Sequence, residues 1–399
     1  DLITVQDTLE GNGDLPELVK LGGKDYLTQL AQETPSVANI ESYAEIIKQR
    51  SNLRKLITAV DQISKTARES DSSSSDQVID NAEERILSLR DDFKRSAGPK
   101  EIRDLLGPVY SFIQEANESG DSLIGVSTGF SEIDEITLGF QRSDLIVIAG
   151  RPSMGKTALA LNIAENVARQ TDRTVLIFSM EMSAEQVVRR FISSIANIDL
   201  QRLMRGQLQD NDWEGIDKAL SVLSNKKILL DDTPALSPTE LRARSRRVKR
   251  ENKDLAMIVV DYIGLMQIPG KSENRVTEIS EISRSLKALA KELDVPVVAI
   301  SQLNRAVESR PNKRPILSDL RDSGAIEQDA DVIAFLYRHE YYDRSDLENK
   351  GKAEINIAKQ RNGPTRTTSL AFRDSVARFE NLAKDERYPT QYYEDGEGD

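Results

Sequence analysis

Apolar residues in the first part of the chain recur every three or four positions, as they do along one face of an α-helix. This spacing runs from Ile40 to Ile63 and resumes from Val78 to Phe93. Residues 70–76, between the two runs, are polar and rich in serine, which is typical of a turn. The pattern predicts two long amphipathic helices in an antiparallel hairpin, which is more often an interaction element than a catalytic one.

A third apolar run extends from Ile102 to Ile113 and follows a short linker at 96–100. It predicts one more amphipathic helix, which the Gly107-Pro108 pair can kink or split. The apolar face of this helix can pack on its own chain or on a neighbouring subunit. The pattern alone leaves both alternatives open.

From Val126 onward, short apolar stretches alternate with helical patterns, which predicts an α/β domain with a largely parallel sheet and helices on both faces. The last two stretches, separated by Asn362-Gly363-Pro364, predict a β-hairpin at the edge of this sheet. The stretches predicted as strands are 145–149, 174–178, 227–230, 256–260, 295–300, 331–337, 354–358 and 367–372.

Residues 150–157 read Gly-Arg-Pro-Ser-Met-Gly-Lys-Thr and match the phosphate-binding loop pattern between a predicted strand and a predicted helix. This setting makes an accidental match a poor explanation, because it places bound phosphates at a helix N-terminus. Lys156 is expected to reach the β and γ phosphates of a nucleoside triphosphate, and the Thr157 hydroxyl is expected to bind Mg²⁺. The predicted nucleotide-binding residues are Gly150, Arg151, Ser153, Met154, Gly155, Lys156, Thr157 and Ala158.

Three other predicted strands end in polar side chains that suit triphosphate hydrolysis. Asp261 is predicted to serve the same Mg²⁺ ion, directly or through water. Glu181 can orient and deprotonate the attacking water, although a solvated residue near a helix cap is the alternative. Gln302 can sense the γ-phosphate, although it can also be an ordinary polar strand end.

Two clusters of cations allow a functional and an ordinary interpretation. Lys359 and Arg361 lie on the predicted hairpin and can reach a γ-phosphate on another molecule, or they can belong to a solvated turn. The helix predicted at 239–250 carries six cations that can contact DNA. These cations spread around the helix, which favours a solvated or subunit-facing helix that balances an acidic chain.

Composition narrows the class of protein further. The 399 residues include no cysteine and one histidine, His339, which excludes disulfides, thiolate metal sites and multi-histidine metal sites. The net charge of −12 argues against a uniformly basic nucleic-acid coat but allows local contacts with a strand. No apolar run reaches membrane-spanning length and no signal peptide is visible, so we expect a soluble cytoplasmic protein. The chain opens at Asp1 within a helical pattern, so we expect a fragment of a longer protein.

In their order along the chain, these motifs closely resemble those of bacterial replicative DNA helicases of the DnaB type. The resemblance covers nearly the whole chain, and the chain's start falls inside the family's N-terminal domain. The motifs that carry it are the phosphate-binding loop, Phe178-Ser179-Met180-Glu181-Met182, Asp261-Tyr262, Ser301 to Arg305, Asp319 to Asp331, and Lys359 to Pro364.

The resemblance implies a hexameric ring of RecA-like motor domains that hydrolyses ATP with Mg²⁺ at subunit interfaces. Such a ring moves 5′ to 3′ on single-stranded DNA and unwinds the duplex at the replication fork. Carried over by motif, the catalytic residues are Glu181, Lys156, Gln302, Lys359 and Arg361, and the metal ligands are Thr157 and Asp261. Arg321, Asp322 and Gly324 match the loop that follows the DNA backbone, with Asp322 at a position where glutamate is expected.

The same resemblance implies the organisation of the chain and its partners. It gives a partial helical collar at 1–97, a linker with a subunit-docking helix at 98–121, a motor domain at 122–383 and an acidic tail at 384–399. The collar is expected to meet primase and a helicase loader. The alternatives are a recombinase-like, DNA-dependent ATPase that forms filaments, and a ring-forming scaffold that recruits primase.

Overall fold

The structure, a computed structural model, describes residues 40–69, 101–119, 123–268 and 275–382. It also describes the isolated positions 23, 25, 26, 78, 82, 85 and 86. The chain divides into two compact units, residues 1–106 and residues 107–399. The domain boundaries predicted at 97, 121 and 383, like the tail at 384–399, lie outside the described residues and stay predictions.

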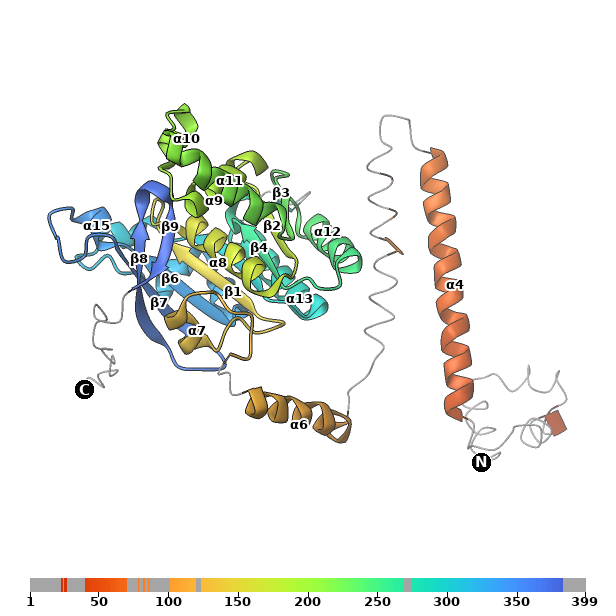
Figure 1. Cartoon of the computed structure of the whole chain (residues 1–399). Coiled ribbons are helices and arrows are strands. Elements are labelled where there is room, and N and C mark those ends of the chain that lie inside the picture. The colour runs from red at the N-terminus through yellow and green to blue at the C-terminus, as the bar shows by residue number, and fades with distance from the viewer. Residues whose placement is uncertain are drawn as a thin grey trace, which may run out of the picture. The chain divides into compact units, whose positions relative to one another are not determined.

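The first unit contains the long helix α4 (Ile40–Glu69), which confirms the first predicted helix (Figure 1). The positions described between 78 and 86 are helical as well, and Arg85 donates a hydrogen bond to the Gln62 side chain of α4. This contact is consistent with the predicted hairpin, whose turn at 70–76 lies outside the described residues.

Helix α6 (Ile102–Ser119) runs without a break through the Gly107-Pro108 pair, so the helix is not split at this point. A proline inside a helix removes one backbone hydrogen bond, which the rest of an 18-residue helix tolerates here. Its apolar side chains are largely exposed in the part of the chain that the structure describes. These exposed residues are Ile102, Leu105, Leu106, Val109, Tyr110 and Ile113.

The second unit is built on a nine-stranded sheet in the order β3-β2-β4-β5-β1-β6-β7-β8-β9. The parallel strands are β1 (Leu145–Gly150), β2 (Val175–Ser179), β3 (Ile228–Asp231), β4 (Met257–Asp261), β5 (Val297–Gln302) and β6 (Val332–Tyr337). The antiparallel strands are β7 (Lys352–Gln360), β8 (Arg366–Arg373) and β9 (Arg378–Asn381). The predicted largely parallel sheet and its β7–β8 hairpin are therefore confirmed.

The hairpin is not the edge of the sheet, which corrects the sequence-based prediction. Strand β9 pairs with β8, with Phe379 opposite Phe372, and so forms the outermost strand beyond the hairpin. It has only four residues, and its burial alternates rather than forming an apolar run. Such a segment carries too little periodicity to be recognised from sequence.

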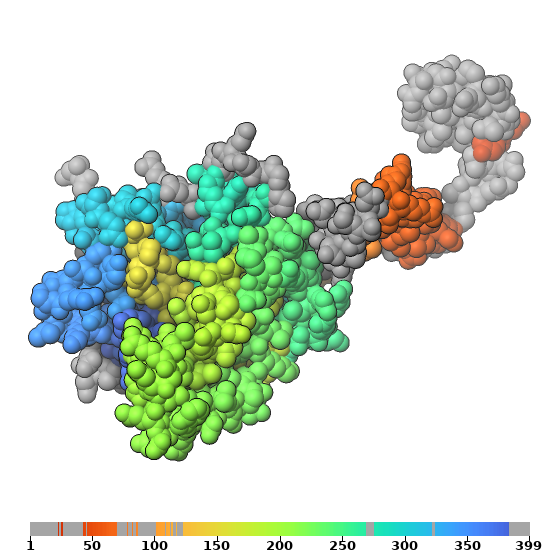
Figure 2. All heavy atoms as spheres, turned by 90° about the horizontal axis from the view of Figure 1, so that it is seen from above, coloured from red at the N-terminus to blue at the C-terminus, as the bar shows by residue number. Residues whose placement is uncertain are grey.

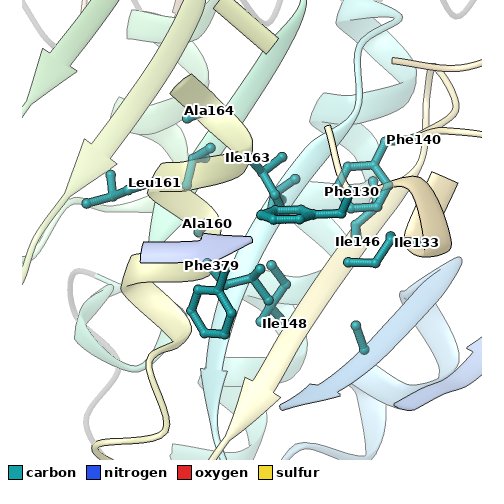
Figure 3. Packing of buried hydrophobic residues seen from close by; sticks show 14 of the residues in the cluster. Phe130, Ile133, Phe140, Ile146, Ile148, Ala160, Leu161, Ile163, Ala164 and Phe379 are labelled. Carbon is teal, nitrogen blue, oxygen red and sulfur yellow. The ribbon is translucent and has the colours of Figure 1, made fainter. Parts of the chain in front are cut away.

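The central strands are apolar along their whole length because both faces of the sheet are covered. Helix α8 (Lys156–Thr171) covers one face and contributes Ala160 and Ile163 to a core that also contains Ile146 and Ile148 of β1 (Figure 3). The alternate β1 positions, such as Val147, face a second core. That core is closed by α12 (Pro238–Glu251) and α13 (Arg275–Leu293).

The remaining helices are short or peripheral. Helices α9 (Ala184–Ala196), α10 (Leu200–Arg205) and α11 (Asp210–Ser224) form one yellow-green to green lobe in the space-filling view (Figure 2). The others are α7 (Ser131–Thr137), α14 (Gly324–Asp329), α15 (His339–Tyr342) and the 3₁₀ helices η3 (Ile263–Leu265), η4 (Arg305–Ser309), η5 (Leu317–Ser323) and η6 (Asp374–Val376). None of the helices in the described ranges is long and apolar enough to span a bilayer.

Candidate active site

The carboxyl ends of the central parallel strands bring four predicted elements to one edge of the sheet. Gly150, where the phosphate-binding loop begins, lies opposite Gln302 in the β1–β5 pairing. Ser179, which precedes Glu181 by two residues, lies opposite Asp261 in the β2–β4 pairing. The strand order therefore assembles residues that lie up to about 150 positions apart in the sequence.

The phosphate-binding loop has the backbone geometry that its sequence requires. Gly155 has a φ of 97° and Ser153 a φ of 65°, both in the left-handed region. A Cβ atom at Gly150 would lie 2.8 Å from the carbonyl oxygen of Leu336, so a larger residue does not fit there. No side chain caps the N-terminus of α8, so its first N–H groups are available for an anion.

Lys156, the first residue of α8, folds back over this loop. Its Nζ donates a hydrogen bond to the carbonyl oxygen of Arg151, at 2.9 Å. The pKa of Lys156 is lowered to about 8, mainly by burial and in smaller part by the Arg151 cation, against the opposing charges of Asp261 and Glu181. The ammonium group lies within electrostatic reach of both carboxylates. A bound phosphate would add further negative charge beside it and so raise the pKa of Lys156 again.

Asp261 ends β4 as a buried carboxylate, with 4% of the residue exposed. Burial raises the pKa of Asp261 to about 6, and the charge of Glu181 also raises it, whereas a hydrogen bond with Thr157 and the charge of Lys156 lower it. Its Oδ1 atom is buried and has no hydrogen-bond partner among the described residues. An orphaned carboxylate oxygen beside a threonine hydroxyl fits a Mg²⁺ ion that takes its other ligands from phosphates and water.

No cluster of three or more acidic, histidine or cysteine side chains forms a metal cage within the described residues. Mg²⁺ at nucleotide sites is ordinarily held by one or two protein oxygens and the substrate, so this observation agrees with the site formed by Thr157 and Asp261.

Glu181 has an exposed side chain just beyond β2, and the N–H of the preceding Met180 donates to the carbonyl oxygen of Asp261, at 2.8 Å. The cap of α9 is made by Ser183 and Gln186, which form a reciprocal capping box. Glu181 is therefore not the cap residue of α9, and its catalytic role stays a prediction. Its charge acts on Lys156 and Asp261, which places it at the same site.

Gln302, the last residue of β5, has an exposed side chain next to the start of the phosphate-binding loop. The N–H of the following Leu303 donates to the carbonyl oxygen of Gly150. This position is suitable for a side chain that contacts the terminal phosphate of a nucleotide.

The methyl group of Ala158, in the predicted nucleotide set, is buried in the hydrophobic core, and the side chains of Met154 and Arg151 in the same set are also committed elsewhere. Met154 is 1% exposed and is part of the hydrophobic core. Arg151 donates from Nε to the Glu308 carboxylate and from Nη1 to the carbonyl oxygen of Leu303, each at 2.8 Å. These residues can offer a nucleotide their backbone, but their side chains point into the protein.

Lys359 and Arg361 lie at the amino ends of the parallel strands, opposite the carboxyl ends where the phosphate-binding loop lies. Strand β7 is antiparallel to β6, so Gln360 pairs with Val332, the first residue of β6. Lys359 donates to the carbonyl oxygens of Glu327 and of Ala330, the latter at 2.8 Å. A strand of six residues such as β1 is about 17 Å long. These cations therefore lie too far from the chain's own phosphate-binding loop to complete its site.

The predicted DNA-binding residues lie in η5 and at the start of α14. The side chains of Arg321 and Asp322 are outside the description, so their role stays a prediction. Gly324 is the exposed first residue of α14. The segment joins β5 to β6, two strands that flank β1 in the sheet.

Several arginine side chains of the basic helix α12 form ion pairs with acidic residues of the same chain. Arg242 and Arg246 both pair with Glu292 of α13, the former at 2.7 Å, and Arg244 pairs with Asp231 of β3, at 2.8 Å. These contacts favour the interpretation that the helix balances acidic residues over one in which it contacts DNA.

Sequence reasoning missed Arg338, which lies at the carboxyl end of β6 as Asp261 lies at the carboxyl end of β4. Arg338 is 7% exposed, donates to the carbonyl oxygen of Ser153 at 3.4 Å and lies 4.2 Å from the centre of the Phe372 ring. A polar residue at the end of an apolar strand was the signal that could have found it. It also missed Glu308, whose partner Arg151 is 157 positions away in the sequence.

Residues 125–381 match the family model of the DnaB-like helicase C terminal domain, and residues 1–49 match that of the DnaB-like helicase N terminal domain. Replicative DNA helicase DnaB of Geobacillus stearothermophilus is 48% identical over 387 residues, which cover 96% of this chain and 83% of the relative. Replicative DNA helicase DnaC of Bacillus subtilis (strain 168) is 47% identical over 385 residues, with the same two shares.

Solved structures agree with these relatives. The structure of a DnaB-like replicative helicase and its interactions with primase has a TM-score of 0.79 at 35% identity and covers 96% of this chain and 88% of that chain. A second solved structure, of an ATPase domain alone, has a TM-score of 0.67 at 41% identity and covers 72% of this chain and 100% of that domain.

Proposed function

The chain belongs to the DnaB-like replicative DNA helicases, which are ATP-dependent enzymes, and we propose that it hydrolyses ATP with Mg²⁺ at sites shared between neighbouring subunits of a ring. The observation that carries this proposal is that the phosphate-binding loop and the two cations, Lys359 and Arg361, lie at opposite ends of the parallel strands. The phosphate-binding loop follows the carboxyl end of β1, and Lys359 and Arg361 lie at the amino end of β6.

One half of the site binds the nucleotide and positions the attacking water. In this proposal, the N–H groups at the start of α8 and Lys156 bind the phosphates, while Thr157 and Asp261 would hold Mg²⁺, which would neutralise phosphate charge. Glu181 accepts the proton of the attacking water, and Gln302 contacts the γ-phosphate. The unpartnered Oδ1 of Asp261 and the exposed carboxylate of Glu181 support these roles.

The other half comes from a second copy of the chain. Cations that cannot reach their own phosphate-binding loop can take part in hydrolysis only if another subunit presents its loop to them, as in arginine-finger enzymes. A contact that joins the carboxyl ends of the parallel strands to their amino ends in the next copy is heterologous. Repeated contacts of this kind form a ring when the rotation between copies closes and an open filament when it does not, and the helicase relatives favour the ring. The exposed apolar face of α6 supports a second contact with a neighbouring subunit. Homo-hexamers are the assembly proposed.

The substrate strand and the partners follow from the same family. We propose that Arg321, Asp322 and Gly324 contact the backbone of single-stranded DNA as the ring moves 5′ to 3′ at a bacterial replication fork. A solved relative was described together with its interactions with primase, which supports primase as a partner of the N-terminal unit. A helicase loader is proposed on the resemblance alone, and the cytoplasm is the proposed location.

The alternatives are less well supported. The matched relatives are replicative helicases, so neither a filament-forming recombinase nor a passive scaffold is favoured. A scaffold would keep its function when hydrolysis is removed, which substitution of Glu181 tests.

Strand displacement from a forked duplex tests the proposed function directly. The wild-type protein should release the labelled strand only with ATP and Mg²⁺, and Lys156→Ala should abolish release. Lys227→Ala is the matched control, since Lys227 is an exposed lysine paired with Asp254 away from the site. ATP hydrolysis that DNA does not stimulate, with no strand released, would contradict the proposal.

A further inference from the structure

The Arg151 side chain ties the phosphate-binding loop to the segment after Gln302, in addition to the backbone hydrogen bond from Leu303 to Gly150. Arg151 donates to Glu308 of η4 and to the carbonyl oxygen of Leu303, and 11% of its side chain is exposed. The carbonyl group of the same Arg151 accepts the Nζ hydrogen bond of Lys156. The position of Arg151 therefore sets where the phosphate-binding lysine finds its partner within the loop.

Glu308 is held in place from a second side. The Tyr342 hydroxyl donates to the same Oε1 atom that accepts from Arg151, at 3.2 Å. The hydrogen bond from Arg151, and then that from Tyr342, lowers the pKa of Glu308, so its carboxylate stays charged near neutral pH. Lys313 lies 4.6 Å above the Tyr342 ring and adds a cation to the same cluster.

The segment from Leu303 to Asp319, which we call the strap, continues from this anchor to the predicted DNA loop. Asp319, at the far end of the strap, is 7% exposed, and its carboxylate accepts a hydrogen bond from Arg310 at 2.7 Å. The N–H of Asn304 donates to the carbonyl oxygen of Asp319, at 3.2 Å. The strap is thus closed on itself by hydrogen bonds between its two ends, and the loop that contains Arg321 follows directly.

We propose that Glu308 is a positioning residue that, through Arg151, couples the phosphate-binding loop to the DNA loop by way of the strap. This inference rests on the proposed function, because it requires that DNA bound near residues 321–324 accelerates ATP hydrolysis. Displacement of the DNA loop moves Asp319, and the strap carries that movement to Glu308 and Arg151. Arg151 then shifts the carbonyl group that competes with phosphate for the Lys156 ammonium group.

An ATPase assay with and without an oligothymidylate strand tests the coupling in the full chain. Glu308→Gln keeps the size of the side chain and an oxygen that can accept from Tyr342 but removes the charge that holds Arg151. The ratio of the DNA-stimulated rate to the basal rate should fall by about fivefold or more, as expected for loss of a coupling of ordinary size.

Two further variants separate coupling from damage to the fold. Tyr342→Phe removes one hydroxyl from Glu308 and should reduce DNA stimulation in the same direction but by less. Arg310→Gln breaks the contact at the other end of the strap and should reproduce the Glu308→Gln result. Glu251→Gln is the matched control, because Glu251 is an exposed carboxylate paired with Arg247 on α12, and its stimulation should equal that of wild type.

The outcomes distinguish this inference from the proposed function. If wild-type hydrolysis is not stimulated by the strand, the proposed function is wrong. If wild type is stimulated and Glu308→Gln retains the same ratio of stimulated to basal rate, the coupling is wrong. An equal loss of both rates in Glu308→Gln, with an unchanged ratio, would assign Glu308 a purely structural role and overturn the inference as well.

Discussion

The Arg361 guanidinium lies 3.4 Å from the carboxylate of Asp331, at the amino end of the parallel strands and across the sheet from the chain's own phosphate-binding loop. Asp331 is 4% exposed and also accepts a hydrogen bond from the N–H of Leu145, the first residue of β1. The contact therefore holds Arg361 at the amino ends of the parallel strands, which in the proposed ring face the neighbouring subunit.

Arg361→Ala should separate nucleotide binding from hydrolysis. Because the residue lies away from its own nucleotide site, the affinity for a non-hydrolysable ATP analogue should change little, while the turnover rate should fall by about a thousandfold, typical for loss of an arginine finger. Equilibrium binding and steady-state hydrolysis measure the two effects. Arg373→Ala is the control, since Arg373 is an arginine paired with Glu380 on the neighbouring strand. Equal losses in both variants would contradict a specific role for Arg361.

Glu181→Gln should preserve assembly and binding while it stops chemistry. The substitution keeps the shape of the side chain but removes its ability to accept a proton, so hydrolysis should fall by about a hundredfold or more. Strand displacement should stop as well, whereas a scaffold would continue to function normally. Glu185→Gln provides the control on α9, where the exposed Glu185 pairs with Arg189. Full helicase activity in Glu181→Gln would refute the assigned role.

Asp261→Asn should make the metal-free protein more stable against unfolding and should abolish ATP hydrolysis. Since burial raises the folded-state pKa of Asp261 from 3.8 to about 6, the native state binds more protons than the unfolded chain between these two values. The stability from this group is therefore present at low pH and is lost as the pH rises through about 6. Thermal unfolding at pH 7.5 without Mg²⁺ should show a higher Tm for Asp261→Asn than for wild type.

The same substitution should abolish the rise in Tm that Mg²⁺ with a nucleotide gives wild type, because the metal then lacks a ligand. Asp254→Asn is the opposite control, since hydrogen bonds from Lys227 and Thr174 lower the pKa of Asp254 and make its charge favourable. A lower Tm for Asp261→Asn than for wild type at pH 7.5 would show that the Asp261 carboxylate is stabilised by some contact in the fold.

Replacement of Val109 and Ile113 by serine should weaken assembly without unfolding the motor unit. Both side chains are exposed, at 53% and 58%, so their loss costs the isolated chain little. If α6 packs on a neighbour, burial of these side chains favours assembly, and native mass measurement should show fewer hexamers with nucleotide and single-stranded DNA. Gln114→Ser, an exposed polar position on α6, should leave the hexamer population unchanged. An unchanged hexamer population in the double variant would argue against α6 docking.

Much of the motor fold was predictable because parallel strands covered on both faces have continuous apolar sequences. The outermost strand of the sheet, β9, was not predictable, since it has four residues and no clear alternation of apolar and polar positions. Short elements such as α10 and α15 also gave no signal, because six or four residues hold less than two turns of periodicity.

The candidate site was likewise predictable only in part. Glu181, Asp261 and Gln302 were predictable because each follows an apolar strand, and parallel strands end at one edge. The ion pair between Arg151 and Glu308 was not, since nothing local in either sequence specifies a partner so far along the chain. The sequence pattern placed Arg151 with the nucleotide, and only the packing of η4 beside the loop shows where its side chain lies.

A mixture of two inactive variants tests the shared site most directly. Lys156→Ala lacks the phosphate-binding lysine and Arg361→Ala lacks the opposing cation, so each ring made of one variant should be inactive. In randomly mixed rings, about a quarter of the interfaces join an intact loop to an intact cation, because both must come from the correct neighbours. A shared site predicts that ATP hydrolysis returns in proportion to these interfaces. Mixed rings, verified by native mass, that stay as inactive as either parent would contradict it.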